Sequence, residues 1–263
     1  MIPTPKIRLR GVCKSYPRKN DVLEVLSDVD LDVREGEFVC LLGPSGCGKS
    51  TLLNLMGGFA TPSSGTVAVD GDAVEGPDPR RVFVFQEYGI FPWATVSENV
   101  SLGLRDKPKA EAASIAQKNI ELVGLQGFEN VYPSELSGGM KQRVAVARAL
   151  AVSPDLILMD EPFGSLDSLT RLTMRAELLR IWKQKRTTIV FVTHDVDESI
   201  QLAERIVVLS QRPGRILDVL PVALEHPRDV GSPEYVRIKK RLYETMGVRR
   251  SEERRVGKEC SLP

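Results

Sequence analysis

The stretch Gly43–Thr51 reads GPSGCGKST and follows the apolar run FVCLL, Phe38–Leu42. A Gly-x-x-x-x-Gly-Lys-Ser pattern between a strand and a helix is typical of a phosphate-binding loop, in which glycines let backbone N–H groups approach phosphate oxygens. The helical spacing of KSTLLNLMGGF completes that context, which a chance glycine-rich turn would lack. We therefore expect the whole loop to bind a nucleotide: Gly43, Pro44, Ser45, Gly46, Cys47, Gly48, Lys49, Ser50 and Thr51.

Three side chains of this loop have distinct chemistry. Lys49 supplies a positive charge to the β- and γ-phosphates, and the Ser50 hydroxyl can ligate Mg²⁺. Cys47 lies at the start of the expected helix, a position that lowers the pKa of a thiol. We expect thiol reagents to modify Cys47 and ATP to protect it. The spacing of the four cysteines favours neither disulfides nor a metal site.

Two acids follow the apolar run LILM. Asp160 ends this expected strand, and its carboxylate would emerge beside the phosphates as a Mg²⁺ partner. Glu161 comes next, and a second acid there is costly unless a cation or a proton shares the site. We interpret Glu161 as the residue that polarises an attacking water molecule; the alternative is an exposed acid at a strand end.

Two other apolar strands are followed by polar residues. His194 follows TIVFVT and could hydrogen-bond a γ-phosphate, although a lone histidine can also be structural. Gln86 follows RVFVF, and its amide could contact Mg²⁺ or water without adding charge. We expect Glu161, His194 and Gln86 to serve catalysis. Ser50, Gln86 and Asp160 are the expected metal ligands.

Two apolar features could serve either in binding or in packing. Tyr16 could stack on an adenine, because aromatic faces bind bases with little demand on sequence. It could equally be a packed strand residue. The run Ile90–Trp93, IFPW, is costly to leave in water. It is either buried in a helical subdomain or covered by a partner.

Strand and helix patterns alternate along the chain. The stretches 6–16 and 26–33 alternate as half-buried strands do, and short apolar runs separated by helical segments predict a mainly parallel sheet with crossover helices. Residues 88–153 are helical in pattern, with one apolar face in 109–125 formed by Ala112, Ile115, Ala116, Ile120 and Val123. We expect an α/β fold: a P-loop NTPase core, an N-terminal antiparallel β subdomain and an inserted α-helical subdomain.

We expect a single domain over residues 1–249. Its core would comprise about 1–87 and 154–220, the helical subdomain about 88–153, and a C-terminal helix about 233–247. That helix is either a docking element or merely peripheral. Composition is that of a soluble globular chain, with 263 residues, 42% apolar, 27% charged and a formal net charge of +1, which gives no reason to expect nucleic-acid binding. The N-terminus lacks the apolar segment of a signal peptide.

The C-terminal segment 250–263 is charged and has no periodicity. RSEERRVGKEC, Arg250–Cys260, resembles the codon-by-codon translation of a common sequencing-adapter DNA. The alternative is a solvated disordered tail. We interpret 250–263 as non-native and assign it no function, so Cys260 has no expected redox role.

The order of the motifs resembles that of ATP-binding cassette (ABC) ATPases. LSGGMKQR, Leu136–Arg143, is similar to the signature motif of this family, and it precedes LILMDEP, GSLD and VTHD as the family requires. A P-loop kinase or GTPase would leave this stretch unexplained. The resemblance implies that Ser137, Gly138 and Gly139 bind the nucleotide of a second copy. It implies further roles for single residues: Glu161 as catalytic base, Gln86 as Q-loop, Asp167 as D-loop acid, His194 as switch histidine and Tyr16 as adenine-stacking tyrosine.

VFQEYGIFPW, FGSLDSLTR and LSQRPGRI are similar to the importer ATPases for nitrate, sulfonates and taurine, and importers of pyrimidine precursors carry near-identical stretches. The resemblance implies an ATP- and Mg²⁺-dependent ATPase on the cytoplasmic face of the membrane. It would work as a sandwich dimer with itself or a paralogue, and contact a membrane permease near Ile90–Trp93. A solute-binding protein would be an indirect partner. A soluble ABC ATPase acting on nucleic acid or ribosomes is the rival, but the chain lacks coiled-coil heptads and tandem cassettes.

Overall fold

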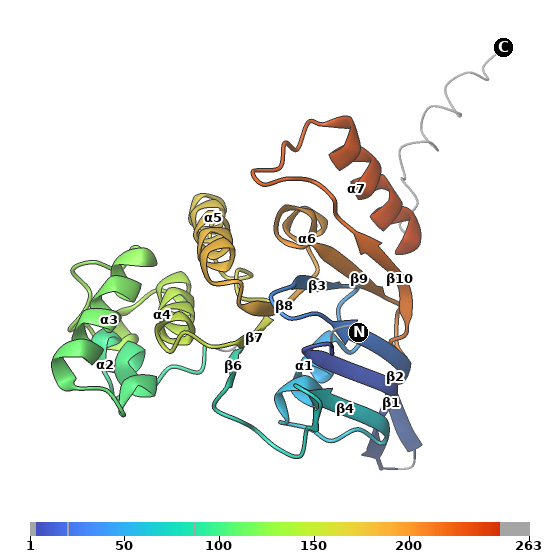
Figure 1. Cartoon of the computed structure of the whole chain (residues 1–263), viewed down its shortest axis with the longest axis horizontal. Coiled ribbons are helices and arrows are strands. Elements are labelled where there is room, and N and C mark those ends of the chain that lie inside the picture. The colour runs from blue at the N-terminus through green and yellow to red at the C-terminus, as the bar shows by residue number, and fades with distance from the viewer. Residues whose placement is uncertain (1–3, 20, 87, 248–263) are drawn as a thin grey trace.

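A computed structural model of the chain describes residues 4–19, 21–86 and 88–247; the adapter-like segment lies outside them. The central sheet has six strands in the order β10-β9-β3-β8-β7-β6. Its members are β3 (Phe38–Leu42), β6 (Arg81–Val84), β7 (Leu156–Asp160), β8 (Thr188–Thr193), β9 (Arg205–Leu209) and β10 (Ile216–Pro221). Only β10 runs antiparallel to its neighbour. Strands β3, β7 and β8 are buried throughout because helices cover both faces of the sheet, as Figure 1 shows.

A second, antiparallel sheet has the order β2-β1-β4-β5. It contains β1 (Ile7–Arg18), β2 (Asp21–Val33), β4 (Ser64–Val69) and a two-residue β5 (Asp72–Ala73) that the sequence did not indicate. The alternate residues Ile7 and Leu9 of β1 are buried, as the half-buried pattern predicts, and Val12 is buried after a shift in strand register. They share one hydrophobic cluster with Leu52 and Leu53 of helix α1 (Lys49–Gly57), so this sheet packs beside the P-loop helix.

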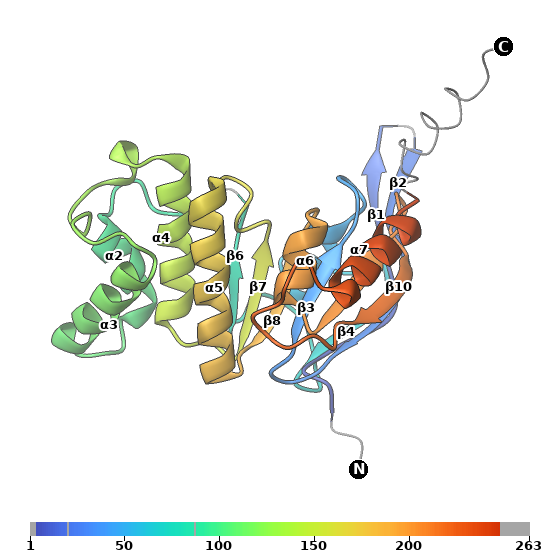
Figure 2. The ribbon, with the colours of Figure 1, turned by 90° about the horizontal axis from the view of Figure 1, so that it is seen from above.

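The helical block gathers beside β6, at one end of the molecule in both Figure 1 and Figure 2. It comprises α2 (Val96–Ser101), η1 (Leu102–Leu104), α3 (Lys109–Leu122), η2 (Pro133–Glu135) and α4 (Gly138–Ala151). Within the predicted apolar face, Ala116, Ile120 and Val123 are buried, while Ala112 and Ile115 are half-buried against the same core.

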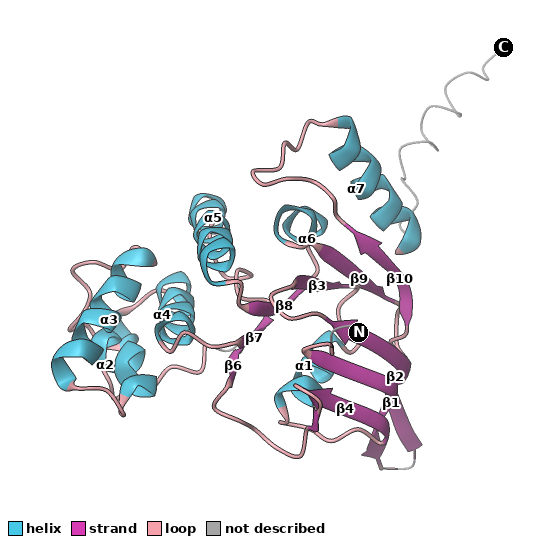
Figure 3. Cartoon of the chain, in the orientation of Figure 1, coloured by secondary structure: helices cyan, strands magenta, loops and turns pink. Residues whose placement is uncertain are grey.

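Three further helices complete the chain: α5 (Ser168–Lys185), α6 (Val196–Leu202) and α7 (Pro233–Thr245). In Figure 3 they lie on the face of the central sheet opposite α1. Helix α7 packs through Tyr235 and Leu242, which are buried. The predicted fold class, a mainly parallel α/β core with an N-terminal antiparallel sheet and an inserted helical block, is confirmed. None of the helices in the described ranges combines the length and hydropathy needed to cross a bilayer.

Candidate functional site

The P-loop connects β3 to α1 through a backbone that only glycine can adopt. Gly48, the residue before α1, has a φ of 105°, in the left-handed region. A Cβ there would lie 2.8 Å from Leu26 Cδ2 and 3.1 Å from the Val25 carbonyl oxygen. The loop is therefore pressed against β2, and its curvature depends on this glycine.

Lys49 points back into the loop. Its side chain is buried, with 5% exposed. The Nζ atom donates hydrogen bonds to the carbonyl oxygens of Gly43 at 2.7 Å and Pro44 at 3.0 Å. These two carbonyls hold the ammonium inside the curve of the loop, at the first turn of α1, where backbone N–H groups favour anions.

Cys47 does not have the expected environment. Its side chain is 1% exposed, and its Sγ atom lies 3.9 Å from Lys49 Nζ. Burial raises the pKa of the Cys47 thiol, and the charge of Lys49 and nearby hydrogen bonds offset only part of this effect. The expectation of a lowered pKa was wrong because the thiol points into the core behind the loop instead of toward solvent.

We accordingly expect Cys47 to resist thiol reagents in the folded protein. In peptide mapping after a short exposure to iodoacetamide, Cys13, which is partly exposed, should be labelled well before Cys47. The buried Cys40 serves as a matched control for slow labelling. After unfolding in urea, all three should react equally. Rapid labelling of native Cys47 that ATP suppresses would restore the original expectation.

Asp160 meets the requirements of a Mg²⁺ ligand. It is 8% exposed, and its Oδ1 has no hydrogen-bond partner among the described residues. Burial raises the pKa of its carboxyl, an effect that the charge of Glu161 increases and that a hydrogen bond from Ser50 and the charge of Lys49 reduce. A buried, unpartnered carboxylate oxygen beside a serine hydroxyl is the donor set that Mg²⁺ takes in P-loop sites.

Glu161 and His194 meet at the edge of the sheet. His194 Nδ1 lies 3.1 Å from Glu161 Oε2, and the two side chains are 59% and 19% exposed. Glu161 has a φ of 44°, which is unusual for a residue with a side chain. Two backbone hydrogen bonds hold this conformation, from Glu161 N to Val192 O and from Gly164 N to Glu161 O, both 3.1 Å. In this conformation the Glu161 carboxylate contacts the His194 ring.

Strand register explains why these polar residues come together. Val84 of β6 pairs with Met159 of β7, which pairs with Phe191 of β8. The three parallel strands therefore end at one edge, and the residues that follow them emerge side by side. Gln86, exposed after β6, lies at the same edge as Glu161 and His194.

The signature residues lie elsewhere. Ser137 is exposed and caps α4, its Oγ accepting a hydrogen bond from Met140 N at 3.3 Å. A Cβ on Gly138 would lie 2.9 Å from the Tyr88 hydroxyl, and one on Gly139 3.3 Å from Leu166 Cδ2. Figures 1 and 2 place α4 on the opposite side of β6 from β3, which leads into the P-loop. One copy of the chain thus does not bring the two together.

Asp167 and Tyr16 both make contacts with residues close to them in sequence. Asp167 is exposed and caps α5, accepting hydrogen bonds from Leu169 N at 3.1 Å and Thr170 N at 3.0 Å. Hydrogen bonding, that of Thr170 foremost, lowers the pKa of its carboxyl. The Tyr16 ring is 39% exposed on β1, with Lys14 Nζ 4.8 Å from its centroid. Adenine stacking by Tyr16 stays a prediction.

Two residues that contact the P-loop, Arg212 and Gly214, were not identified from the sequence. Arg212 donates to the Gly46 carbonyl oxygen from Nε at 3.0 Å and from Nη2 at 2.8 Å. Gly214 lies so close that a Cβ on it would be 2.2 Å from the Cys47 carbonyl oxygen. The stretch QRPG signals a turn, but no local pattern shows that the turn braces a loop 166 residues away.

Comparisons with known proteins point to one family. The family model described as ABC transporter matches residues 26–164. An uncharacterized ABC transporter ATP-binding protein of Methanocaldococcus jannaschii is 46% identical over 239 residues, 90% of each chain. The aliphatic sulfonates import ATP-binding protein SsuB of Bacillus cereus is 42% identical over 236 residues, 90% of this chain and 94% of that one.

A solved structure is also similar. It is a dimeric ATP-binding cassette in a post-hydrolysis state, bound to ADP and Pi, with a TM-score of 0.77 and 34% identity over 83% of this chain and 100% of that one. Fold, motif order and sequence identity point the same way, and the chain belongs to the ABC transporter family as one of its ATP-binding cassette ATPases.

Proposed function

We propose that this chain is the ATP-hydrolysing subunit of an importer for a small anionic solute of the nitrate, sulfonate or taurine type. The main observation that supports an ATPase site is the 3.1 Å contact between Glu161 and His194, which lies at the same edge of the sheet as Asp160. Similarity to SsuB over nine-tenths of the chain supports the importer and its substrate class. An importer of another small solute, such as a pyrimidine precursor, is the alternative.

Lys49, Ser50 and Asp160 would hold the triphosphate and its metal ion. The P-loop amides and the Lys49 ammonium would bind the β- and γ-phosphates, and the Ser50 hydroxyl and Asp160 Oδ1 would ligate Mg²⁺. Bound Mg²⁺ neutralises charge that develops on the phosphate oxygens. Burial of Asp160 disfavours its charged form, so the carboxylate gains most when a cation shares the site.

Glu161 would orient the attacking water and accept its proton. Its Oε2 contacts His194 Nδ1, and the exposed remainder of the imidazole is free to reach a γ-phosphate oxygen. Hydrolysis would depend on the contact between His194 and the γ-phosphate, which is lost when the γ-phosphate leaves. Gln86, at the same edge, would contact the metal ion or the water.

A second copy would supply the signature helix. Ser137 and Gly139 lie at the exposed start of α4, remote from their own P-loop, and backbone N–H groups at such a start bind anions. Dimeric cassettes are among the similar solved structures. Each ATP would be held between one P-loop and the partner's signature, so that the nucleotide stabilises the dimer. The partner would be a second copy of this chain or a paralogous ATPase.

The membrane subunit would contact an apolar patch formed by Phe91, Pro92 and Trp93. Ile90 and Phe91 are both half-buried, Ile90 against the core, whereas Trp93 is 73% exposed. The ring centroids of Trp93 and Phe91 lie 5.1 Å apart. Buried Asn99 fixes the backbone of Phe91 with hydrogen bonds of 2.8 and 3.1 Å. An exposed aromatic surface on a rigid backbone is typical of a protein interface.

Replacing Trp93 by alanine should uncouple transport from hydrolysis. We expect the isolated subunit to hydrolyse ATP at the wild-type rate, because Trp93 is exposed and outside the nucleotide site. Binding to the permease should weaken by about 2 kcal/mol or more, the usual cost of losing a central aromatic anchor. Pull-down with the permease in detergent measures this. Phe128→Ala, which removes another exposed aromatic, is the control. Unchanged permease binding by Trp93→Ala would move the interface elsewhere.

The substrate class is tested by reconstitution with the permease and binding protein encoded nearest to the gene. ATP turnover in proteoliposomes should rise when an aliphatic sulfonate, nitrate or taurine is present with the binding protein. Stimulation by a pyrimidine precursor alone would favour the alternative. Stimulation of the isolated subunit by DNA or RNA would favour the nucleic-acid ATPase.

A further inference from the structure

The two neighbours of His194 are fixed by one buried acid, Glu198. Glu198 Oε2 accepts a hydrogen bond of 2.6 Å from the Thr193 hydroxyl. Thr193 Oγ1 in turn accepts one of 3.0 Å from Asp195 N. Asp195 closes the ring by capping α6, its Oδ1 accepting from Glu198 N at 3.0 Å. His194 therefore stands in a short loop whose two sides are tied together by Glu198.

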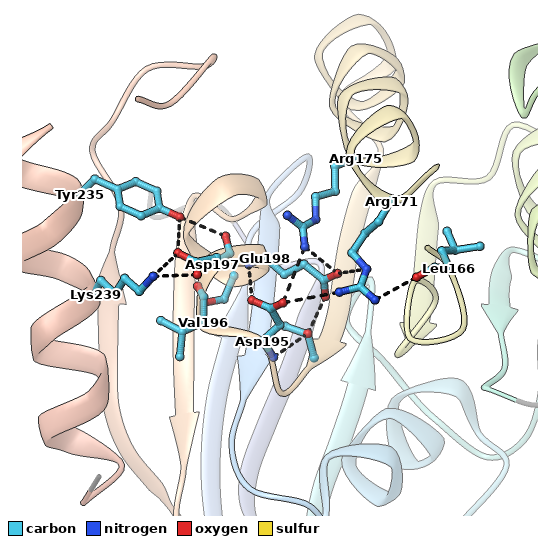
Figure 4. Close-up of polar contacts among 11 residues, drawn as sticks. Leu166, Arg171, Arg175, Asp195, Val196, Asp197, Glu198, Tyr235 and Lys239 are labelled. Atoms are coloured by element: carbon cyan, nitrogen blue, oxygen red, sulfur yellow. Dashed lines mark hydrogen bonds and ion pairs between the residues drawn. The ribbon is translucent and has the colours of Figure 1, made fainter. Parts of the chain in front are cut away.

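The second oxygen of Glu198 connects this loop to helix α5, as Figure 4 shows. Arg175 Nη2 lies 3.0 Å from Glu198 Oε1 and 3.8 Å from Asp195 Oδ2. The side chains of Arg175 and Glu198 are only 13% and 7% exposed. A buried ion pair of this kind adds little net stability, but it disfavours other arrangements, since separating it would leave a buried charge unpaired.

The same cluster reaches the segment Gly164–Asp167. Arg171 Nη2 donates to the Leu166 carbonyl oxygen at 3.0 Å, and its guanidinium lies 3.9 Å from both Asp195 Oδ2 and Glu198 Oε1 (Figure 4). Leu166 immediately precedes Asp167. Two basic and two acidic side chains thus join the Asp167 segment to the His194 loop.

Helix α6 is also held from its other side. Asp197 accepts a hydrogen bond of 2.9 Å from the Tyr235 hydroxyl and pairs with Lys239 at 2.7 Å, both on α7 (Figure 4). Since α5 and α7 both restrain α6, the His194 loop has a fixed base.

We propose that Glu198 is a positioning residue for hydrolysis. Through its contacts with Thr193 and Asp195, Glu198 positions the His194 ring relative to Glu161. Through its contacts with Arg175 and Arg171, it also fixes the position of this ring relative to the Asp167 segment. The proposal rests on the role of His194 in the proposed function. It goes beyond that function by naming the groups that hold the histidine.

The test removes the Thr193 hydroxyl, which connects Glu198 to the backbone of Asp195. Thr193→Val keeps the shape of a buried strand residue but removes two hydrogen bonds of the His194 loop. We expect kcat for ATP to fall about tenfold or more, because a misplacement of about 1 Å can cost about 100-fold. ATP affinity should stay unchanged. Thr193→Ser, which retains the hydroxyl, should recover most of the turnover.

Thr188→Val is the matched control. Thr188 lies at the other end of the same strand, is 1% exposed, and accepts a hydrogen bond of 3.0 Å from Gly36 N. It should cost comparable stability without the loss of kcat. The ¹⁵N chemical shifts of the histidine rings are also measured in both valine variants. The spectrum is simple because the chain has two histidines. Only Thr193→Val should change the chemical shifts of His194.

A His194→Ala background separates the two proposals. If Thr193 acts through His194, Thr193→Val should change the remaining kcat less than about twofold in that background, since residues acting as a unit are not additive. Three results would overturn the positioning role without affecting the role of His194. They are a tenfold loss of kcat in the His194→Ala background, wild-type turnover by Thr193→Val, and failure of Thr193→Ser to restore turnover. Wild-type turnover by His194→Ala itself would remove the switch role and the positioning role together.

Discussion

Replacing Glu161 by glutamine is expected to lower kcat for ATP about 10²- to 10⁴-fold, the range attributed to a positioned general base. Glutamine keeps the size of the side chain and can still contact His194, so the local structure should persist. It lacks the basicity needed to take a proton from water. ATP should still bind through Lys49 and the P-loop amides. A long-lived ATP-bound dimer should therefore accumulate.

Turnover is measured by phosphate release, and dimerisation by light scattering with ATP and Mg²⁺. Glu177→Gln is a matched control, because Glu177 is an acid on α5 that pairs with Arg180. It should behave as the wild type. Wild-type turnover by Glu161→Gln would show that another group accepts the proton.

Replacing Ser137 by arginine should abolish both dimerisation and hydrolysis while ATP binding to the monomer persists. Ser137 is exposed at the start of α4, and a long side chain there would occupy the space that a partner's γ-phosphate needs. The P-loop lies on another part of the chain, so Lys49 and its neighbours would keep their nucleotide. Equilibrium binding of a fluorescent ATP analogue and light scattering report the two properties separately.

Two controls separate the blocked surface from other effects of this change. Ser137→Ala removes only the cap that accepts from Met140 N, at a cost of about 1 kcal/mol in stability. It should still dimerise. Ser134→Arg adds the same charge to an exposed position in η2 and should be active. Normal turnover by Ser137→Arg would contradict the sandwich arrangement.

Most of the fold followed from local pattern. Continuous apolar runs predicted β3, β7 and β8, and an apolar face predicted the buried side of α3. These signals are reliable because burial on both faces of a sheet, or on one face of a helix, demands a fixed spacing of apolar residues. The short strand β5 escaped because two residues carry no periodicity.

Prediction of the site was uneven for a physical reason. Asp160, Glu161, His194 and Gln86 were visible as polar residues that end apolar runs. The environment of Cys47 was not, because its pKa depends on burial against a core contributed by distant segments.

The sequence by itself determined the phosphate-binding loop, the order of the motifs and the buried strands, since each depends on residue types a few positions apart. The tertiary structure alone decided which strand ends meet, that Cys47 is shielded, and that Arg212 braces Gly46. It also decided that Glu198 ties together the loop around His194. Desolvation and ion pairing depend on groups brought together by folding, so no local pattern encodes them.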